Sequence, residues 1–344
     1  DALKYLPSLI VRKRNYGDQQ SPLATRTSGL GQSARSLIYA DGVLLSALIG
    51  NNNTLASPRW ALVAPNEIER IDVMYGPFSA AYAGNSMGAV VDITTRMPKA
   101  FEAAAVTTAT AQDYSLYGTS QTYASSQYGI QLGNRYNDLS WRITGNFLDS
   151  RTQPLNMITA LTPATPSGAG ARVSGAYVDQ NRLGQPIVVI GSGGIEHKHQ
   201  DTLKFKAAYD ITPEWQASYT YGYFQNIANS NVETYLRNSA GNPVFSGSVN
   251  INGYNYVIPA SAFSGTNGYY KLNQSQSAQS VSLKSDMGRT WDWEAVYSEV
   301  VFDLDAFRSP TAALPTGFNA SAGSIQALNG TGRSEEHTSE LQSH

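Results

Sequence analysis

Alternation of apolar and polar residues over segments of about ten residues is the feature that most limits how this chain can fold. The clearest example is LSWRITGNF at 139–147, where Leu139, Trp141 and Ile143 would share one face of a strand and Arg142 the other. Tilted strands of about 9–11 residues cross a bilayer, and a two-faced strand suits a wall between lipid and water. Soluble sandwiches alternate as well, so alternation alone leaves both architectures open.

The spacing of these segments favours a membrane barrel. From residue 103 onward the pattern predicts seven strands, at about 104–112, 122–134, 138–150, 200–211, 214–226, 277–286 and 290–303. Short connections at 134–138, 211–214 and 286–290 alternate with long polar ones at about 152–199 and 227–275. Outer-membrane barrels have short periplasmic turns, long outer loops and aromatic girdles. The alternative is a secreted or surface β-sandwich adhesin or binding protein, which should not alternate its loops so regularly.

Composition excludes several classes of protein. The 344 residues carry a formal net charge of -2, which argues against a nucleic-acid partner. With no cysteine, the chain has no disulfide framework, thiolate metal site or cysteine nucleophile. It also lacks the run of about 18 apolar residues that a membrane-spanning helix needs.

The first 97 residues have a different texture, which predicts a small α+β domain. Asp41-Gly42 separates two short apolar runs, a hairpin signal because both turn positions need positive φ. The residues after Pro65 resemble a capped helical turn. Alternation at 71–75 and a β-branched run at 89–95 predict two strands.

This region also carries a family resemblance. PNEIERIDVMYGPFSAAYAGNSMGAVVDITTRMP at 65–98 resembles the plug-domain signature of TonB-dependent outer-membrane receptors, with its IERIEV strand, Gly-Pro turn and final strand. DALKYLPSLIVRKR and LIYADGVLL are similar to the opening segment and the hairpin of that domain. Tyr75 and Asp92 depart from the usual arginine and asparagine of that signature.

The resemblance implies a fold class and a domain division. We expect an α+β plug domain at 1–98, followed at 99–332 by antiparallel strands of an incomplete 22-stranded transmembrane β-barrel. About fifteen strands of such a barrel would then lie outside this chain, a truncated reading frame. RSEEHTSELQSH at 333–344 resembles a translated sequencing adapter, so we expect a non-native tail, with a native polar tail as the alternative.

The resemblance also implies a function and partners. A TonB-dependent receptor lies in the outer membrane of a Gram-negative bacterium, with its plug inside the barrel and facing the periplasm. It binds outer-membrane lipid and a scarce nutrient, commonly a ferric siderophore. TonB, energised by its inner-membrane complex, then pulls on the plug to open a path. We expect a transporter with no cofactor and no nucleic-acid partner, whose TonB-pairing segment lies outside this chain.

Two groups of site residues follow from the same analogy. An apex rich in amides, cations and an aromatic side chain suits a polar chelate, although a flexible polar loop is the alternative. The candidate ligand contacts are Arg26, Gln32, Asn51, Asn52, Asn53, Arg59 and Trp60. The candidate charged contacts between plug and barrel are Glu67, Glu69, Arg70 and Asp72, with an ordinary solvated turn as the alternative.

Three other motifs predict little chemistry. Residues 84–88 fit G-x-S-x-G, but a β-branched strand follows them where a nucleophile elbow needs a helix, so we predict no catalytic residue. His197 and His199 would share a strand face, as a pair of metal ligands does, but a solvated strand end is the favoured interpretation and no metal site is predicted. Inward-facing cations such as Arg142, Lys204 and Lys206 are expected to line an aqueous lumen.

Overall fold

The computed structural model of the chain describes most of its residues. These are 3, 5–19, 21–26, 29, 36–45, 61–76, 82, 88–265, 268–286, 291–319, 323–327 and 333–343. Within this part of the chain, no helix is long and apolar enough to cross a membrane.

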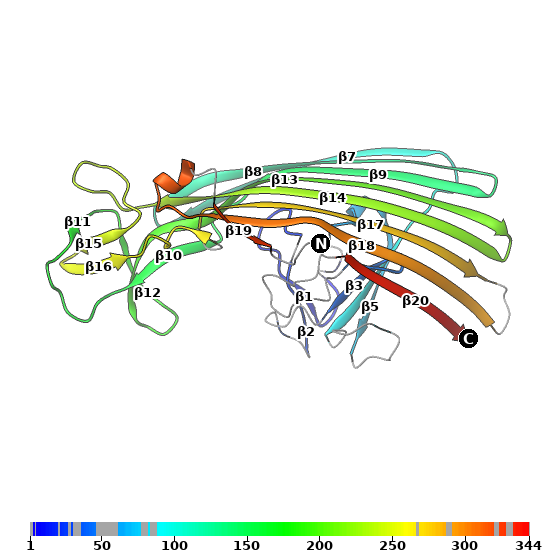
Figure 1. The fold of residues 1–344 in the computed structure, drawn as a ribbon, viewed down its shortest axis with the longest axis horizontal. Helices are drawn as coiled ribbons and strands as arrows, with labels where there is room; N and C mark the ends of the chain where they lie inside the picture. The colour runs from blue at the N-terminus through cyan, green and yellow to red at the C-terminus, as the bar shows by residue number, and fades with distance from the viewer. Residues whose placement is uncertain are drawn as a thin grey trace.

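Seven long strands form one curved antiparallel sheet, which we call the wall (Figure 1). They are β7 (Glu102–Leu116), β8 (Thr119–Tyr136), β9 (Leu139–Arg151), β13 (Pro186–Thr212), β14 (Trp215–Thr234), β17 (Tyr270–Ser285) and β18 (Trp291–Pro310). Each pairs with the next in this order, and each overlaps one of the seven ranges expected from the alternation. Beyond them, β19 (Gly323–Ala327) and β20 (Arg333–Ser343) both pair with β18, and η4 (Thr316–Asn319) is a short 3-10 helix.

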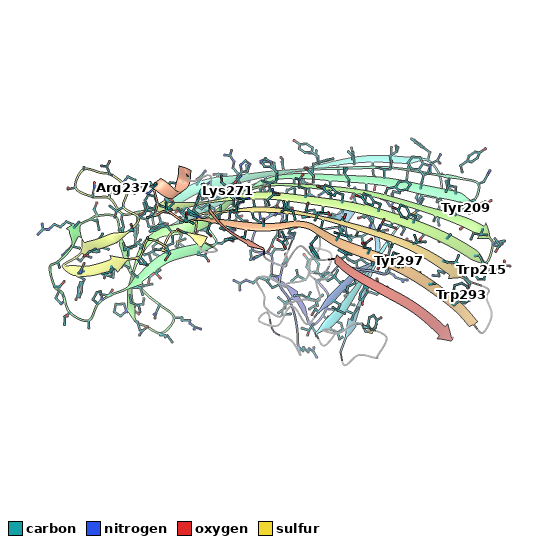
Figure 2. The ribbon with its side chains drawn as sticks, viewed as in Figure 1. Tyr209, Trp215, Arg237, Lys271, Trp293 and Tyr297 are labelled. Atoms are coloured by element: carbon teal, nitrogen blue, oxygen red, sulfur yellow. The ribbon has the colours of Figure 1, made fainter. Side chains whose placement is uncertain are left out.

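The two faces of the wall differ as the alternation predicts. Ile143 and Phe205 are exposed on the outer face, whereas Arg142 and Lys204 are buried on the inner face. At the end with the short turns, Tyr209, Trp215 and Trp293 gather near the strand ends (Figure 2). The ring centroids of the two tryptophans are 4.7 Å apart. This apolar outer face with aromatic residues at its edge is typical of a barrel in a lipid bilayer.

The long connections gather at the opposite end of the wall (Figure 1). One contains β10 (Asn156–Leu161), β11 (Ala171–Arg172) and β12 (Tyr177–Gln180), and the other contains β15 (Gly247–Ile251) and β16 (Tyr254–Ile258). Strands β11, β15 and β16 form a small sheet, and an apolar cluster that includes Leu236, Val249 and Phe263 packs these loops together. The outer loops are therefore a packed layer with a core of their own.

The first outer connection differs from the expected alternation of short and long loops. Strands β7 and β8 pair as far as Leu116 and Thr119, which leaves a two-residue turn at the outer end. Tyr117 takes a positive φ of 52° there, and its ring lies 5.6 Å from that of Tyr177 in β12. Regular alternation is thus wrong at this loop, because the ladder continues past the apolar and polar pattern on which the prediction rested.

The plug consists of two small sheets. Strands β1 (Leu9–Val11) and β2 (Leu23–Thr25) pair with each other, and β3 (Leu37–Ala40), β4 (Val43–Leu44), β5 (Ile68–Tyr75) and β6 (Ala89–Thr95) form a sheet in the order β4-β3-β6-β5. The predicted hairpin is confirmed, with Asp41 at φ 50° and Gly42 at φ 78°. The expected helical turn is the 3-10 helix η2 (Pro65–Glu67).

The plug lies against the inner face of the wall (Figure 1). One apolar cluster joins the two parts, with Leu23 and Val91 from the plug and Phe224, Ala278 and Phe302 from the wall among its members. The expected fold class, a plug domain followed by antiparallel strands of a transmembrane barrel, is confirmed. The exact boundary near residue 98 and the non-native origin of the segment that forms β20 stay predictions.

Candidate functional site

The inner face of β13 contacts the plug along a row of six residues. Alternate residues of a strand point to one face, so positions 196 to 206 in steps of two all face inward. Each of them bonds a plug residue. We call Glu196, Lys198, Gln200, Thr202, Lys204 and Lys206 the β13 row.

Two lysines form the end of this row nearest the short turns. Lys206 Nζ lies 3.0 Å from Asp41 Oδ1 and 3.0 Å from the Thr95 hydroxyl. Lys204 Nζ lies 3.4 Å from Glu67 Oε2 and 3.8 Å from Asp41 Oδ2. Two cations of the wall thus face two carboxylates of the plug, and this arrangement neutralises all four charges.

Asp41 is the centre of this group. The Thr95 backbone N–H donates to Oδ1 at 2.9 Å and the Thr95 hydroxyl donates to Oδ2 at 2.6 Å. Burial raises the pKa of Asp41, but Lys206, Lys204 and the two bonds from Thr95 outweigh it and hold the pKa below its ordinary value. Asp41 is therefore ionised at neutral pH and attracts both lysines.

Glu67 is held from the plug side as well. Its side chain is 3% exposed, and Oε1 accepts the backbone N–H of Ala64 at 2.7 Å, as in a capping box. The second oxygen, Oε2, faces Lys204. The same carboxylate therefore closes the turn that precedes β5 and contacts the wall.

Arg142 on β9 adds a third cation to this region. It donates to the backbone oxygens of Arg96 at 2.9 Å and Asn66 at 3.2 Å, and it also bonds Gln131 on β8. The prediction that Arg142, Lys204 and Lys206 face inward is right. Their expected aqueous surroundings are wrong, since plug atoms surround them and all three are largely buried.

The other half of the row contacts the first segment of the plug. Lys198 Nζ lies 2.7 Å from Glu196 Oε2 and donates to Asn15 Oδ1 at 2.8 Å. The Asn15 amide in turn donates to Glu196 at 3.3 Å. Gln200, the next residue of the row, donates to the backbone oxygen of Gly17 at 2.8 Å, so the first plug segment is held by three consecutive members of the β13 row.

Neutral amides and hydroxyls extend these contacts across neighbouring strands. Tyr16 donates to Gln127 on β8 at 2.6 Å, and its backbone oxygen accepts from Ser150 on β9 at 3.1 Å. Gln19 donates to Gln274 on β17 at 2.7 Å. Such bonds exchange readily with water, because each amide or hydroxyl can find an equivalent partner there.

The structure places the predicted plug contacts on two different faces. Glu67 lies at the interface with Lys204, whereas Glu69, Arg70 and Asp72 are exposed on β5, where Arg70 and Asp72 pair at 2.8 Å. The role of the four as plug and wall contacts stays a prediction. Sequence reasoning missed Asp41 and Asn15, because their contacts with the wall depend on how the plug docks.

Most of the predicted ligand contacts lie outside the described residues. Arg26 is exposed at a bend after β2. The other six, Gln32, Asn51, Asn52, Asn53, Arg59 and Trp60, fall outside the described part, as does Ser86 of the G-x-S-x-G motif. The outer loops hold a cavity of about 420 Å³ between β10 and β16, lined mainly by apolar side chains such as Met157, Ile190 and Val257.

The chain resembles known proteins in sequence and in fold. Residues 1–90 match the family model of the TonB-dependent receptor plug domain. The vitamin B12 transporter BtuB of Vibrio vulnificus strain YJ016 is 23% identical over 261 residues, which cover 74% of this chain and 34% of that protein. The chain thus spans about a third of the length of this curated relative.

Solved structures of several receptors show partial similarity. The ferripyoverdine receptor of Pseudomonas aeruginosa matches with a TM-score of 0.48 at 12% identity, over 93% of this chain and 33% of that one. The ferric enterobactin receptor PfeA of Pseudomonas aeruginosa matches with 0.43 at 13%, over 90% and 47%. The copper transporter OprC matches with 0.48 at 10%, over 97% and 46%.

Proposed function

We propose that the protein imports a scarce nutrient. The premise is that this chain is the plug and adjoining barrel wall of a TonB-dependent receptor in a Gram-negative outer membrane. Import would be driven by TonB and its inner-membrane energising complex, which act on the plug. The protein is then a transporter and not an enzyme, and its lipid partner is the outer membrane itself.

The observation that carries this proposal is the contact between the plug and the inner face of the wall. Charged pairs, amides and hydroxyls make up the β13 row and its neighbours. A blocked lumen must open and close again, and polar contacts can break and re-form with little net cost because water offers replacement partners.

A ferric siderophore is the substrate class that we propose. The predicted plug apex combines amides, a cation and an aromatic side chain, which suits a polar and anionic chelate. The BtuB relative, named as a vitamin B12 transporter, supplies a specific second candidate, a corrinoid. Both are large, scarce nutrients, so the same architecture serves either one.

Uptake measurements test the proposal directly. The complete receptor that contains this chain would be expressed in a Gram-negative host without its own siderophore and vitamin B12 receptors, with and without TonB. We expect accumulation of radioactive iron from at least one ferric siderophore only in the host with TonB. Uptake of labelled cobalamin instead would replace the substrate and keep the transport function.

The adhesin alternative gives a different result in the same strains. An adhesin or binding protein would accumulate neither nutrient, and its surface binding would not depend on TonB. Absence of the protein from outer-membrane fractions, or equal uptake with and without TonB for every nutrient tried, would overturn the transport proposal.

A further inference from the structure

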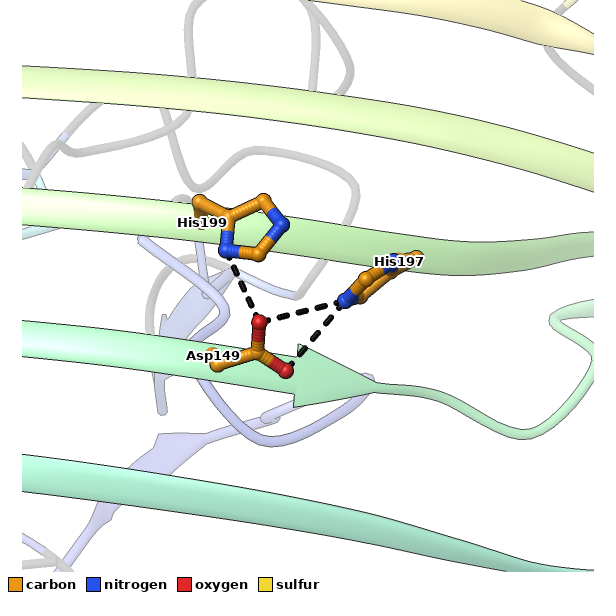
Figure 3. Close-up of side chains that lie close together, drawn as sticks. All are labelled: Asp149, His197 and His199. Carbon is orange, nitrogen blue, oxygen red and sulfur yellow. Dashed lines mark hydrogen bonds and ion pairs between the residues drawn. The ribbon is translucent and has the colours of Figure 1, made fainter.

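A cluster of two histidines and an aspartate lies on the outer face of the wall, behind the β13 row. His197 and His199 alternate with the inward residues of β13, so they face outward. Asp149 is the direct neighbour of His199 on β9. Figure 3 shows the three side chains pointing toward one another from the two strands, and we call them the His–Asp cluster.

The ligand atoms of the cluster are spaced as they would be around one metal ion. Asp149 Oδ2 lies 2.8 Å from His199 Nδ1 and 3.2 Å from His197 Nε2. All three ligand atoms lie within 4.8 Å of one another. With metal-to-ligand distances of about 2.0–2.2 Å, the edge of a tetrahedral site is about 3.3–3.6 Å. Small side-chain rotations therefore suffice to enclose an ion.

The donor set indicates which ion would bind. Two imidazoles and one carboxylate are ligands of Zn²⁺ and of related divalent transition ions, whereas Mg²⁺ and Ca²⁺ prefer oxygen alone. Three protein ligands leave at least one coordination position open. That position would face away from the wall, because the inner side of the strand is occupied by the plug.

The depth of the cluster places it at the outer edge of the apolar band of the wall, where the exposed Ile227 on β14 is the direct neighbour of His199. Exposed apolar residues such as Ile143 and Phe205 mark that band. Asp149 is ten residues along β9 from Leu139, where the strand leaves its short turn, so the cluster lies near the outer end of a span of about 9–11 residues. An ion there would be reachable from the medium.

Two other charged residues face the cluster from the same strands. Asp201 follows His199 by two positions on β13, and Arg151 is paired with His197 on β9. Asp201 favours a cation, whereas Arg151 opposes it. We propose that Asp149, His197 and His199 form a surface site for Zn²⁺ or a related divalent transition ion on the outer rim of the wall, separate from the import path.

Metal titration of the full chain in detergent tests this site. We expect one Zn²⁺ per chain by calorimetry, and a Cu²⁺ spectrum by electron paramagnetic resonance that shows two coordinating nitrogens. Removing a residue that only hydrogen-bonds a metal ligand already lowers the metal affinity about 10- to 100-fold. His197→Asn, His199→Asn and Asp149→Asn should therefore each weaken Zn²⁺ binding at least about tenfold.

The remaining histidines of the chain supply the matched control. The sequence has four, and the other two are His337 and His344. The double variant H337N/H344N should bind Zn²⁺ like the unchanged protein. Retained affinity in all three cluster variants, or loss of binding in H337N/H344N, would overturn the proposal. A change in electrophoretic mobility between unheated and heated samples shows that each variant is folded. Weaker Zn²⁺ binding then cannot be assigned to a misfolded wall.

Discussion

Asp41 is the plug residue that contacts both lysines of the β13 row. Its carboxylate lies between Lys204 and Lys206 and is buried with them. Removing one partner of a buried ion pair costs about 3–5 kcal/mol, since the other charge is left unpaired. We expect Asp41→Asn and Lys206→Met each to lower the free energy of plug unfolding by about 3 kcal/mol, measured by denaturant titration in detergent.

A double-mutant cycle separates this pair from general damage. The double variant should cost clearly less than the sum of the single variants, because the two residues share one contact. The exposed pair Arg70 and Asp72 is the matched control, and Asp72→Asn should change stability by less than about 1 kcal/mol. Additive effects at Asp41 and Lys206 would contradict the contact.

The lowered pKa of Asp41 makes plug docking sensitive to acid. A carboxylate with a folded-state pKa below its unfolded value adds stability above the unfolded value, and this stability is lost as pH falls through the folded pKa. The ordinary value is 3.8, so the loss is expected below about pH 4. Protease accessibility of the plug between pH 7 and pH 3 measures it, and Asp41→Asn should remove this acid-dependent step.

At this scale the sequence predicts orientation but not partners. Lys204 and Lys206 alternate with apolar residues at the odd positions of the same strand, and this pattern indicates that both lysines face inward. Their contact with Asp41 depends on how the plug docks, and no periodicity along the chain encodes that. The same holds for Asn15, which ends up beside Glu196 and Lys198.

The hairpin between β3 and β4 is the element that presents Asp41 to the wall. Gly42 has a φ of 78°, and a Cβ there would lie 3.5 Å from Val296 on β18. A residue with a side chain pays about 1–2 kcal/mol for left-handed backbone. Gly42→Ala should therefore destabilise the plug by about that amount and increase its protease accessibility.

Gly241 gives the control for backbone strain alone. It has a similar φ of 80°, lies in an outer-loop turn and has open space around it. Gly241→Ala should strain its own loop without changing the protease accessibility of the plug. Equal effects of the two substitutions on the plug would show that the hairpin does not position Asp41.

Strand prediction from the sequence is accurate inside the membrane band and too short outside it. β13 is expected at 200–211 but extends over Pro186–Thr212. In its first part Val188, Val189 and Ile190 are all buried, so both faces are covered. β10 and β12 pair with the two edges of this part, and Val188 and Ile190 belong to the apolar cluster of the outer loops. Apolar and polar residues do not alternate there, because both faces of the strand have apolar surroundings.

For the whole molecule, the apolar outer face of the wall predicts a depth-dependent response to charge. Phe205 is exposed on this face, four residue pairs from the short-turn end at Leu139 and Tyr209. A lipid-facing arginine near the bilayer centre costs about 2–4 kcal/mol. Phe205→Arg should lower folding stability in lipid vesicles by that amount and reduce assembly in the outer membrane.

Val257 is the matched control, because it is an equally apolar and even more exposed residue of the outer loops. Val257→Arg should leave folding in vesicles and outer-membrane assembly unchanged. A similar loss for both variants would contradict the assignment of the outer face to lipid.

The overall architecture can be predicted from the sequence, but the contacts between its parts cannot. Seven strands, tight turns at one end and long loops at the other can be predicted from alternation and spacing. The packed layer of outer loops cannot, since β11 pairs with β15 across about 75 intervening residues. The His–Asp cluster needs β9 beside β13 in one register, which the distance between Asp149 and the histidines along the chain conceals.

The β13 row also has a mechanical consequence. Its plug contacts begin with Asn15 and Gly17 at the outer end, continue with Ala61, and end with Asp41, Glu67 and Thr95 at the lysine end, so the first plug segment and the lysine end are loaded separately. A force applied to the first residues would break the contacts of the plug with the β13 row one after another, beginning with those of Asn15 and Gly17. A force applied beyond Thr95 would act on the contacts of Lys204 and Lys206 together. We expect single-molecule traces with many small force steps in the first direction and one large rupture in the second, and identical traces would rule out this ordering.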